Sequence, residues 1–286
     1  MTHLGPEWED PRRVLSRHGA RPKRRFSQNF LTDQHVVDDI ASAVRPGEGE
    51  RIIELGPGAG TLTAALLRQG AHVVGVERDP AMRALLASEF EGFALTVVDA
   101  DAAALDLRDA ELRGDTPEEA RIAVCGNLPY AISGAIFRRL VAERERIDRA
   151  VVMVQREVAL RLAASAGEKA YGALSVFIGT VFQVEPVMRV KPGSFFPAPK
   201  VESAVVRLTP LEKERAPVDD SRFIAVVRAA FGMRRKTLRN ALKRIEGSRE
   251  ALESAGVDGG RRGETLTPEE FASVAAALPP QPVPEP

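Results

Sequence analysis

Short apolar runs alternate with amphipathic segments along most of the chain. Runs rich in Val, Ile and Leu predict strands, and apolar positions that recur every three or four residues predict the helices between them. The predicted strands are residues 51–55, 72–76, 95–98, 121–125, 149–155, 182–189 and 201–208. The predicted helices among them are residues 33–44, 61–69, 81–90, 133–144 and 157–164. This alternation predicts an α/β protein with a largely parallel sheet.

The pattern changes after Thr209. Residues 210–217 are charged and contain two prolines, which suits a linker, and a basic amphipathic helical region follows at 223–242. Thr267 is predicted to cap a last helix, because a proline follows it and a glutamate stands three residues on.

Both ends of the chain lack the pattern of packed elements. Residues 1–20 show no apolar periodicity, and the last eight residues are rich in proline. The predicted organisation is a disordered extension over 1–20, an α/β domain over 21–209, a small helical domain over 210–278 and a disordered tail over 279–286.

Composition narrows the class of protein. The chain of 286 residues is 44% apolar and 28% charged, as in ordinary globular proteins. It has no apolar run long enough to span a bilayer, and its arginine-rich start does not resemble a secretory signal. One cysteine and four scattered histidines favour neither a disulfide framework nor a metal site. We therefore expect a cytoplasmic monomer without metal and without membrane contact.

The formal net charge of zero hides a division along the chain. Residues 12–25 hold seven basic residues and residues 222–245 hold eight, with no acidic residue in either segment. Outside them the chain has 25 basic and 40 acidic residues. Two concentrated basic segments predict contact with a polyanion such as a nucleic acid, and an ordinary solvated helix face is the alternative.

A glycine-rich loop follows the first predicted strand. Residues 54–60 read ELGPGAG, and their G-x-G-x-G spacing differs from the G-x-G-x-x-G of a nicotinamide dinucleotide site. The spacing favours S-adenosyl-L-methionine (AdoMet), which has no pyrophosphate, over a purely structural turn. Glu77, 21 residues after Gly56, suits ribose hydroxyls, and Asp101 suits an adenine amino group unless it is an ordinary surface aspartate.

The tetrapeptide at 127–130 suits chemistry on an exocyclic amine of a nucleobase. Such an amine is a poor nucleophile, because its lone pair is delocalised into the ring. The Asn127 amide oxygen and the Leu128 carbonyl can accept its hydrogens, Pro129 fixes the backbone, and Tyr130 offers a ring for stacking. Positioning would then supply most of the acceleration of methyl transfer. The alternative is a turn rich in Asn and Pro.

Five blocks of the chain resemble the KsgA family of ribosomal RNA adenine dimethyltransferases. The blocks read FSQNFL (26–31), ELGPGAG (54–60), NLPYAIS (127–133), FFPAPKVES (195–203) and RRKTLRN (234–240). The resemblance spans residues 21–278. It implies a class I, Rossmann-like, AdoMet-dependent methyltransferase with a seven-stranded sheet and a small C-terminal helical domain. One departure from the family pattern is Ser27, which stands where the family usually has glycine.

The resemblance also implies roles for single residues. The expected cofactor contacts are Asn29, Leu31, Gly56, Glu77, Asp101 and Asn127. The expected catalytic set is Asn127, Leu128, Pro129, Tyr130 and Phe195, with Phe195 stacking on the flipped adenine opposite Tyr130. The residues expected on rRNA phosphates are Arg24, Arg25, Arg228, Arg234, Arg235, Lys236 and Arg239.

The activity implied is dimethylation of the N6 amine of two adjacent adenosines near the 3′ end of 16S rRNA, in the small ribosomal subunit or its precursor. One alternative is an Erm-type enzyme that dimethylates one adenosine of large-subunit rRNA. The other is a largely non-catalytic assembly factor that retains the fold.

Overall fold

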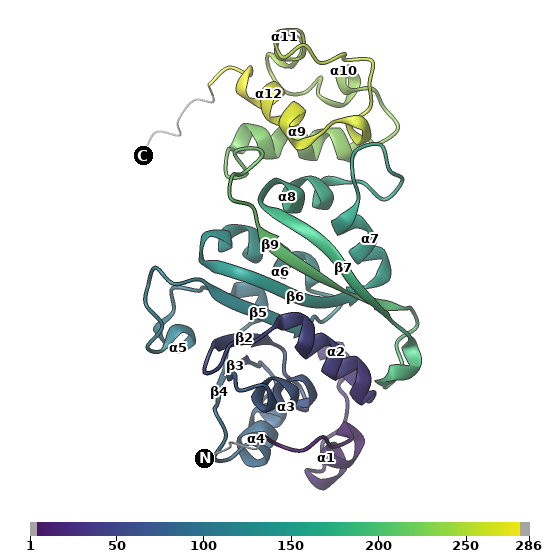
Figure 1. The fold of residues 1–286 in the computed structure, drawn as a ribbon. Helices are drawn as coiled ribbons and strands as arrows, with labels where there is room; N and C mark the ends of the chain where they lie inside the picture. Colours follow the sequence, from purple (N-terminus) through teal and green to yellow (C-terminus); the bar gives the residue numbers. More distant parts are fainter. Residues whose placement is uncertain (1–4, 281–286) are drawn as a thin grey trace. The chain divides into compact units, whose positions relative to one another are not determined.

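The computed structural model describes residues 5–280, in which the chain forms two compact units (Figure 1). One unit contains the residues up to Ala159 together with Glu185–Pro210. The other contains Leu160–Val184 together with the residues from Leu211 onward. The chain thus changes unit beside the boundary predicted after residue 209, but the second unit also takes in residues 160–184, which the pattern had placed in the α/β domain.

The main sheet has seven strands in the order β4-β3-β2-β5-β6-β9-β7. Its strands are β2 (Arg51–Leu55), β3 (His72–Val76), β4 (Leu95–Val98), β5 (Ile122–Asn127), β6 (Ile147–Gln155), β7 (Phe182–Val190) and β9 (Ser203–Pro210). Strands β2 to β6 pair in parallel, and β9 is antiparallel to β6. The predicted α/β fold with seven strands is confirmed. The carboxyl ends of β2, β3 and β5 lie side by side, which brings three sequence motifs to one edge.

Helices precede the first of these strands or connect one strand to the next. They are α2 (Gln34–Val44), α3 (Thr61–Arg68), α4 (Pro80–Glu89), α5 (Ala110–Arg113), α6 (Ser133–Ala142) and α7 (Arg156–Ala163). Ile52, Ile53 and Leu55 of β2 are all fully buried, so both faces of the strand are covered, as a continuous apolar run requires. A two-stranded antiparallel sheet joins β1 (Phe30–Leu31) to β8 (Phe195–Phe196). Single-turn 3₁₀ segments lie at 24–26, 102–104, 144–146, 192–194 and 263–265.

The prediction of disorder over residues 1–20 is wrong for the part that the structure describes. Helix α1 (Pro11–Arg17) starts at the Asp10 cap, and Val14 and Leu15 are buried in the core of the first unit. Arg17 also donates to Glu89 of α4 at 2.6 and 3.0 Å. Seven residues are too few to show a helical period, and this helix is stabilised by tertiary contacts.

The second unit is helical. It contains α8 (Ala173–Val181), α9 (Ser221–Gly232), α10 (Leu238–Ala241), α11 (Ser248–Ser254) and α12 (Pro268–Ala276). Phe231 packs against Tyr171 and Phe271, with ring centroids 5.8 and 5.9 Å apart. Tyr171 and α8 share this core with α9 and α12, which explains why residues 160–184 belong to the unit. The predicted cap at Thr267 is confirmed, because Thr267 and Glu270 form a reciprocal capping box.

The basic region at 223–242 is not one continuous helix. Helix α9 ends at Gly232, and α10 begins only at Leu238, so residues 233–237 form a turn that displays consecutive basic side chains. Of the predicted disordered tail, residues 281–286 lie outside the described residues. No helix between residues 5 and 280 is long and apolar enough to cross a membrane. Over that same range no group of His, Cys, Asp or Glu is arranged to hold a metal ion.

Candidate active site

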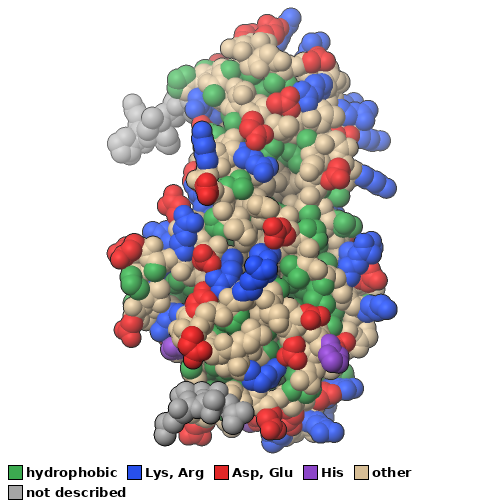
Figure 2. Space-filling model, in the orientation of Figure 1, with side chains coloured by type: hydrophobic (Ala, Val, Ile, Leu, Met, Phe, Trp, Pro, Cys, Tyr) green, Lys and Arg blue, Asp and Glu red, His purple; other side chains and the backbone are tan. Residues whose placement is uncertain are grey.

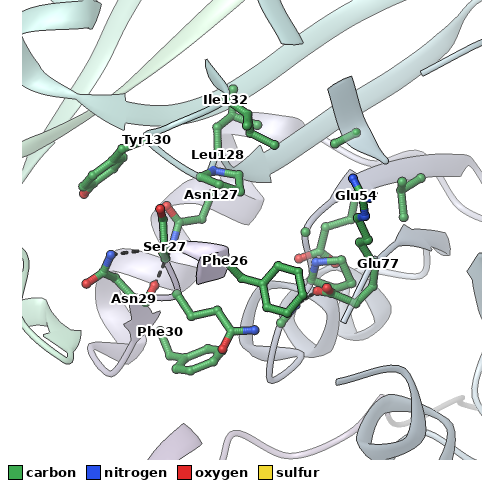
Figure 3. Close-up of a pocket in the computed structure, with 18 of the residues that line it drawn as sticks. Phe26, Ser27, Asn29, Phe30, Glu54, Glu77, Asn127, Leu128, Tyr130 and Ile132 are labelled. Atoms are coloured by element: carbon green, nitrogen blue, oxygen red, sulfur yellow. Dashed lines mark hydrogen bonds between the residues drawn. The ribbon is translucent and has the colours of Figure 1, made fainter. Parts of the chain in front are cut away.

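A cavity of about 560 Å³ opens at the carboxyl ends of β2, β3 and β5 (Figure 3). Its volume lies in the range of roughly 300–1,000 Å³ that small-molecule sites occupy. Its lining comes from five segments, within residues 25–31, 54–62, 76–78, 100–102 and 127–132. Every expected cofactor residue is in this lining: Asn29, Leu31, Gly56, Glu77, Asp101 and Asn127.

The glycine-rich loop turns sharply between β2 and α3. Gly56, Gly58 and Gly60 have φ values of 73°, 57° and 78°, a region that favours glycine. A Cβ at Gly60 would also lie 2.4 Å from the Phe90 ring. The spacing of the three glycines is therefore required by the path of the backbone, and Gly56 and Gly58 line the cavity.

Glu77 is fixed at the end of β3. It is 8% exposed, and its carboxylate accepts hydrogen bonds from the Gly58 amide at 3.1 Å and the Asp79 amide at 2.8 Å. Burial raises the pKa of Glu77, although these amide bonds oppose the shift. A carboxylate held in this way at the cavity wall suits a ligand with two neighbouring hydroxyls.

Glu54, near the end of β2, is a buried carboxyl group in the cavity lining, and its pKa is strongly shifted. It is 2% exposed, and it accepts a hydrogen bond from the Thr63 hydroxyl at 2.6 Å. Burial raises the pKa of Glu54 from 4.5 to about 7, the Thr63 hydrogen bond opposes this, and the neighbouring Glu77 charge adds to it. An ionised Glu54 would be stabilised by a cationic ligand in the cavity.

Glu54→Gln should stabilise the ligand-free protein in alkaline solution. The folded protein holds the Glu54 proton up to about pH 7, whereas the unfolded chain releases it near pH 4.5. Folding therefore becomes less favourable as pH rises between these values, by about 3 kcal/mol in total. We expect Glu54→Gln to be up to about 3 kcal/mol more stable than the native protein at pH 8, with a smaller gain near pH 5, measured by urea unfolding. Glu91→Gln, at an exposed site, is the control, and an equal gain at both pH values would contradict the assignment.

Asp101 is placed beyond β4. It caps the turn at 102–104 by accepting a hydrogen bond from the Ala103 amide at 2.9 Å, and it pairs with Arg78 at 2.5 Å. Both partners hold the Asp101 carboxylate, and Asp101 lines the cavity. Contact of Asp101 with an adenine amino group stays a prediction.

Asn127 is the last residue of β5, and its side chain is held by a neighbouring motif. Its Nδ2 donates to the Asn29 carbonyl oxygen at 2.9 Å, and Asn127 lines the cavity. The Leu128 amide donates to the Met153 carbonyl at 3.0 Å. No described residue donates to the Asn127 amide oxygen or to the Leu128 carbonyl. Two acceptors without donors at one turn suit a ligand that brings its own N–H groups.

Tyr130 is held at its hydroxyl by a residue that the sequence did not single out. The hydroxyl lies 2.7 Å from Ser203 Oγ, and Ser203, at the start of β9, is fully buried. Burial raises the pKa of Tyr130, so the phenol stays neutral near pH 7. Figure 3 shows the Tyr130 ring on the same side of the cavity as Asn127, with its hydroxyl directed away. Ser203 closes the predicted FFPAPKVES block, which was the available signal.

Gly126 is a second residue that the sequence analysis missed. Its φ is 156°, and a Cβ there would lie 2.4 Å from the Leu55 carbonyl oxygen of the neighbouring strand. Glycine therefore allows β5 to approach β2 closely at the residue before Asn127.

Phe195 is not in the cavity lining. It is 5% exposed, it pairs with Leu31 in the β1–β8 sheet, and it packs in the core of the first unit, whereas the next residue, Phe196, is 39% exposed. The structure therefore does not bring Phe195 to face Tyr130 across the cavity, as the stacking role requires. Alternation along a strand buries one of two adjacent side chains, and sequence resemblance does not show which.

Ser27 adopts φ 51°, the left-handed region that L residues rarely occupy. This backbone conformation explains why glycine suits the position. The Ser27 carbonyl accepts a hydrogen bond from Asn29 Nδ2 at 3.1 Å, so the turn keeps a defined geometry with serine.

The basic residues divide into paired and unpaired groups. In the N-terminal segment Arg12 pairs with Asp10, Arg17 with Glu9 and Glu89, and Lys23 with Asp79. That segment is therefore less available to a polyanion than its composition suggested. Arg25 lies 4.8 Å from the Phe26 ring centre, and the side chain of Arg24 is outside what the structure describes.

In the helical unit Arg228, Arg235, Lys236 and Arg239 are exposed, and no described acid pairs with them. Arg234 differs, because it pairs with Glu264 at 3.0 Å and donates to the Lys169 carbonyl at 2.6 Å. Figure 2 shows Lys and Arg side chains projecting along one edge of this unit, in the region where Figure 1 draws α9 to α12.

The chain is similar to known proteins over most of its length. The family model described as ribosomal RNA adenine dimethylase matches residues 19–279. Proteins named ribosomal RNA small subunit methyltransferase A from Myxococcus xanthus and Geobacter sulfurreducens are 45% and 44% identical to this chain. The alignments cover 95% and 91% of this chain and 96% of each relative.

Two solved structures are similar over most of their length. A dimethyladenosine transferase from Plasmodium falciparum has a TM-score of 0.72 at 24% identity and shares the fold, covering 86% of this chain and 95% of its own. The 23S rRNA methyltransferase ErmE has a TM-score of 0.61 at 26% identity, covering 87% and 99%. The family match over nearly the whole sequence, together with relatives of this identity, shows that the chain belongs to the AdoMet-dependent ribosomal RNA adenine dimethylase family.

Proposed function

We propose that this enzyme dimethylates the N6 amines of two adjacent adenosines near the 3′ end of 16S rRNA, within the small ribosomal subunit or its precursor. The observation that carries the proposal is the turn at 127–130. There an anchored asparagine and a strand-end carbonyl offer free acceptors beside a tyrosine ring. We further propose that it acts as a monomer in the cytoplasm, where ribosomes are assembled.

The polar groups that line the cavity fit AdoMet. Glu77 would bind the ribose hydroxyls, Asp101 the adenine amino group, and Asn29, Leu31, Gly56 and Asn127 the rest of the cofactor. AdoMet supplies an electrophilic methyl group on a sulfonium. A cation in the cavity would favour the ionised form of Glu54, and Gly56 and Gly58 of the glycine turn line the cavity.

The target amine would be held by the two acceptors of the turn. Hydrogen bonds to the Asn127 amide oxygen and the Leu128 carbonyl draw the nitrogen towards tetrahedral geometry, so that its lone pair points outward. No strong base is needed, because the amine becomes acidic enough to lose its proton once methylated. Pro129 and the Ser133 hydroxyl, which donates to the Tyr130 carbonyl at 3.2 Å, hold the backbone of the turn. Preorganisation of this kind supplies the acceleration.

The exposed cations of the helical unit are the proposed contacts to rRNA phosphates. Arg235→Ala, Lys236→Ala and Arg239→Ala should each weaken binding to small-subunit particles about 3- to 10-fold at low salt and reduce the slope of log K against log salt by about one. AdoMet affinity should not change. Arg249→Ala, on an exposed face of α11 where Glu253 pairs with Arg249, is the control. Unchanged affinity and salt slope in all three variants would remove this surface from the RNA interface.

The small subunit is favoured over the large one as the substrate. The relatives above 40% identity are named for the small subunit, whereas ErmE, named for 23S rRNA, is 26% identical. A purely non-catalytic assembly factor is disfavoured, because every expected cofactor residue lines one cavity and the Asn127 anchor is intact.

The test is methyl transfer from labelled AdoMet to unmethylated small subunits, large subunits and naked rRNA, followed by nucleoside analysis. Dimethyladenosine that appears with the small subunit is the expected result. Label on large-subunit rRNA would favour an Erm-type activity, and no transfer to any substrate would favour a binding factor.

A further inference from the structure

Asp79 is a buried carboxylate of the first unit that belongs neither to the proposed cofactor contacts nor to the proposed RNA contacts. It connects Glu77 to the segment that precedes β1. Asp79 is fully buried and caps α4 by accepting a hydrogen bond from the Ala81 amide at 3.0 Å. Its amide donates to Glu77 at 2.8 Å. Asp79 therefore fixes the start of α4 and the carboxylate proposed for the ribose at the same time.

The segment before β1 closes on this carboxylate with two side chains. Lys23 Nζ lies 2.7 Å from Asp79 Oδ1, and Gln28 Nε2 lies 3.0 Å from Asp79 Oδ2. The Gln28 amide oxygen also accepts a hydrogen bond from the Lys23 backbone amide at 2.8 Å. Lys23, Gln28 and Asp79 thus form a closed network that includes the Lys23 backbone amide, and Asp79 lies 56 and 51 residues along the chain from Lys23 and Gln28.

The segment held by this network forms one wall of the cavity. Residues 25–31 all line it, and Figure 3 shows Phe26, Ser27, Asn29 and Phe30 gathered there. At its far end the segment is tied to Asn127 through the Asn29 carbonyl. Its near end has no strand or long helix of its own, only a single 3₁₀ turn at 24–26, and both Lys23 and Gln28 contact Asp79 there.

We propose that Lys23, Gln28 and Asp79 form a latch that holds residues 25–31 in the conformation that binds AdoMet. The inference rests on the proposed cofactor role of the cavity. The three are positioning residues, because they act through the wall segment and through Glu77. Lys23 therefore serves the cofactor site, although its place in a basic run suggested a polyanion.

The electrostatics of Asp79 suit a permanent latch. Burial raises the pKa of Asp79, but hydrogen bonds from Lys23, Ala81 and Gln28 outweigh it, and the pKa lies below its ordinary value. The carboxylate is therefore ionised throughout the neutral range. In both hydrogen bonds of the latch the acceptor is the charged Asp79 carboxylate, which makes them stronger than hydrogen bonds between neutral groups.

The test is calorimetric titration of the RNA-free full-length protein with AdoMet and with its unreactive analogue sinefungin, combined with amide hydrogen exchange. Lys23→Met and Gln28→Ala should each raise the Kd about 10-fold, as expected if the binding conformation falls to about a tenth of the population. Exchange at residues 25–31 should become faster, with no change in α9 to α12. Lys23→Arg, which keeps the charge, should recover most of the affinity.

Arg21→Ala is the matched control, because it removes an exposed cation from the same segment without touching Asp79. If Lys23→Met leaves the AdoMet Kd and local exchange unchanged, and weakens only RNA binding as Arg21→Ala does, the latch is overturned. A native protein that binds neither AdoMet nor sinefungin would instead refute the proposed cofactor site. The two failures are therefore distinguishable.

Discussion

Replacing Asn127 with alanine should lower methyl transfer about 100- to 1,000-fold, the loss typical of removing one preorganised polar group that acts in a transition state. The substitution removes the free amide oxygen proposed for the target amine. It also removes the hydrogen bond from Nδ2 to the Asn29 carbonyl, which ties the wall segment to β5. The measurement is single-turnover transfer to small subunits at saturating AdoMet, which separates chemistry from cofactor binding.

Gln69→Ala is the control for Asn127→Ala, because it deletes an exposed carboxamide at the end of α3. It should retain native activity. The Asn127 variant should still bind the subunit, since the proposed phosphate contacts lie in the helical unit. If Asn127→Ala methylates at a rate within 10-fold of the native enzyme, the amine cannot depend on this side chain.

Replacement of Tyr130 should give the second-largest loss of methyl transfer activity. The size of this loss should depend on whether the aromatic ring is kept. Stacking of a base on an aromatic side chain contributes about 1–3 kcal/mol, so Tyr130→Ala should lower kcat/KM for the subunit by up to about 100-fold. Tyr130→Phe keeps the ring and loses only the bond to Ser203, which contributes about 1 kcal/mol. We expect a loss of about 5-fold for Tyr130→Phe, with AdoMet affinity unchanged in both variants.

Ser203→Ala completes this series. It should match Tyr130→Phe, and the double variant should lose no more than either single one, because both remove the same 2.7 Å contact. Equal losses for Tyr130→Phe and Tyr130→Ala would show that the hydroxyl, and not stacking, carries the effect.

The side of the site that is proposed to bind the cofactor was predictable because its signals are local. The glycines at 56, 58 and 60 are required by one turn, and Glu77 follows at the end of the next strand of a repeating β–α unit. Parallel strands bring their carboxyl ends to one edge, so motifs at the ends of β2, β3 and β5 meet there without further information.

Other features depended on contacts between distant segments. A two-turn helix such as α1 has too few residues for a periodic signal, and its burial comes from the core beside Glu89. Whether Phe195 or Phe196 is buried depends on the pairing of β8 with β1. The break between α9 and α10 likewise falls within a basic region whose composition is uniform.

The sequence by itself determined the α/β fold, the glycine turn, the positions of the carboxylates proposed for the cofactor and the asparagine of the turn, because periodicity, spacing and backbone conformation are encoded locally. Only the tertiary structure decided that Lys23 faces Asp79 and that Ser203 holds Tyr130, since both pairs join residues more than fifty positions apart. The same is true of the pKa of Glu54, which burial sets. Partner choice and desolvation depend on the packed environment, which no single segment of the chain specifies.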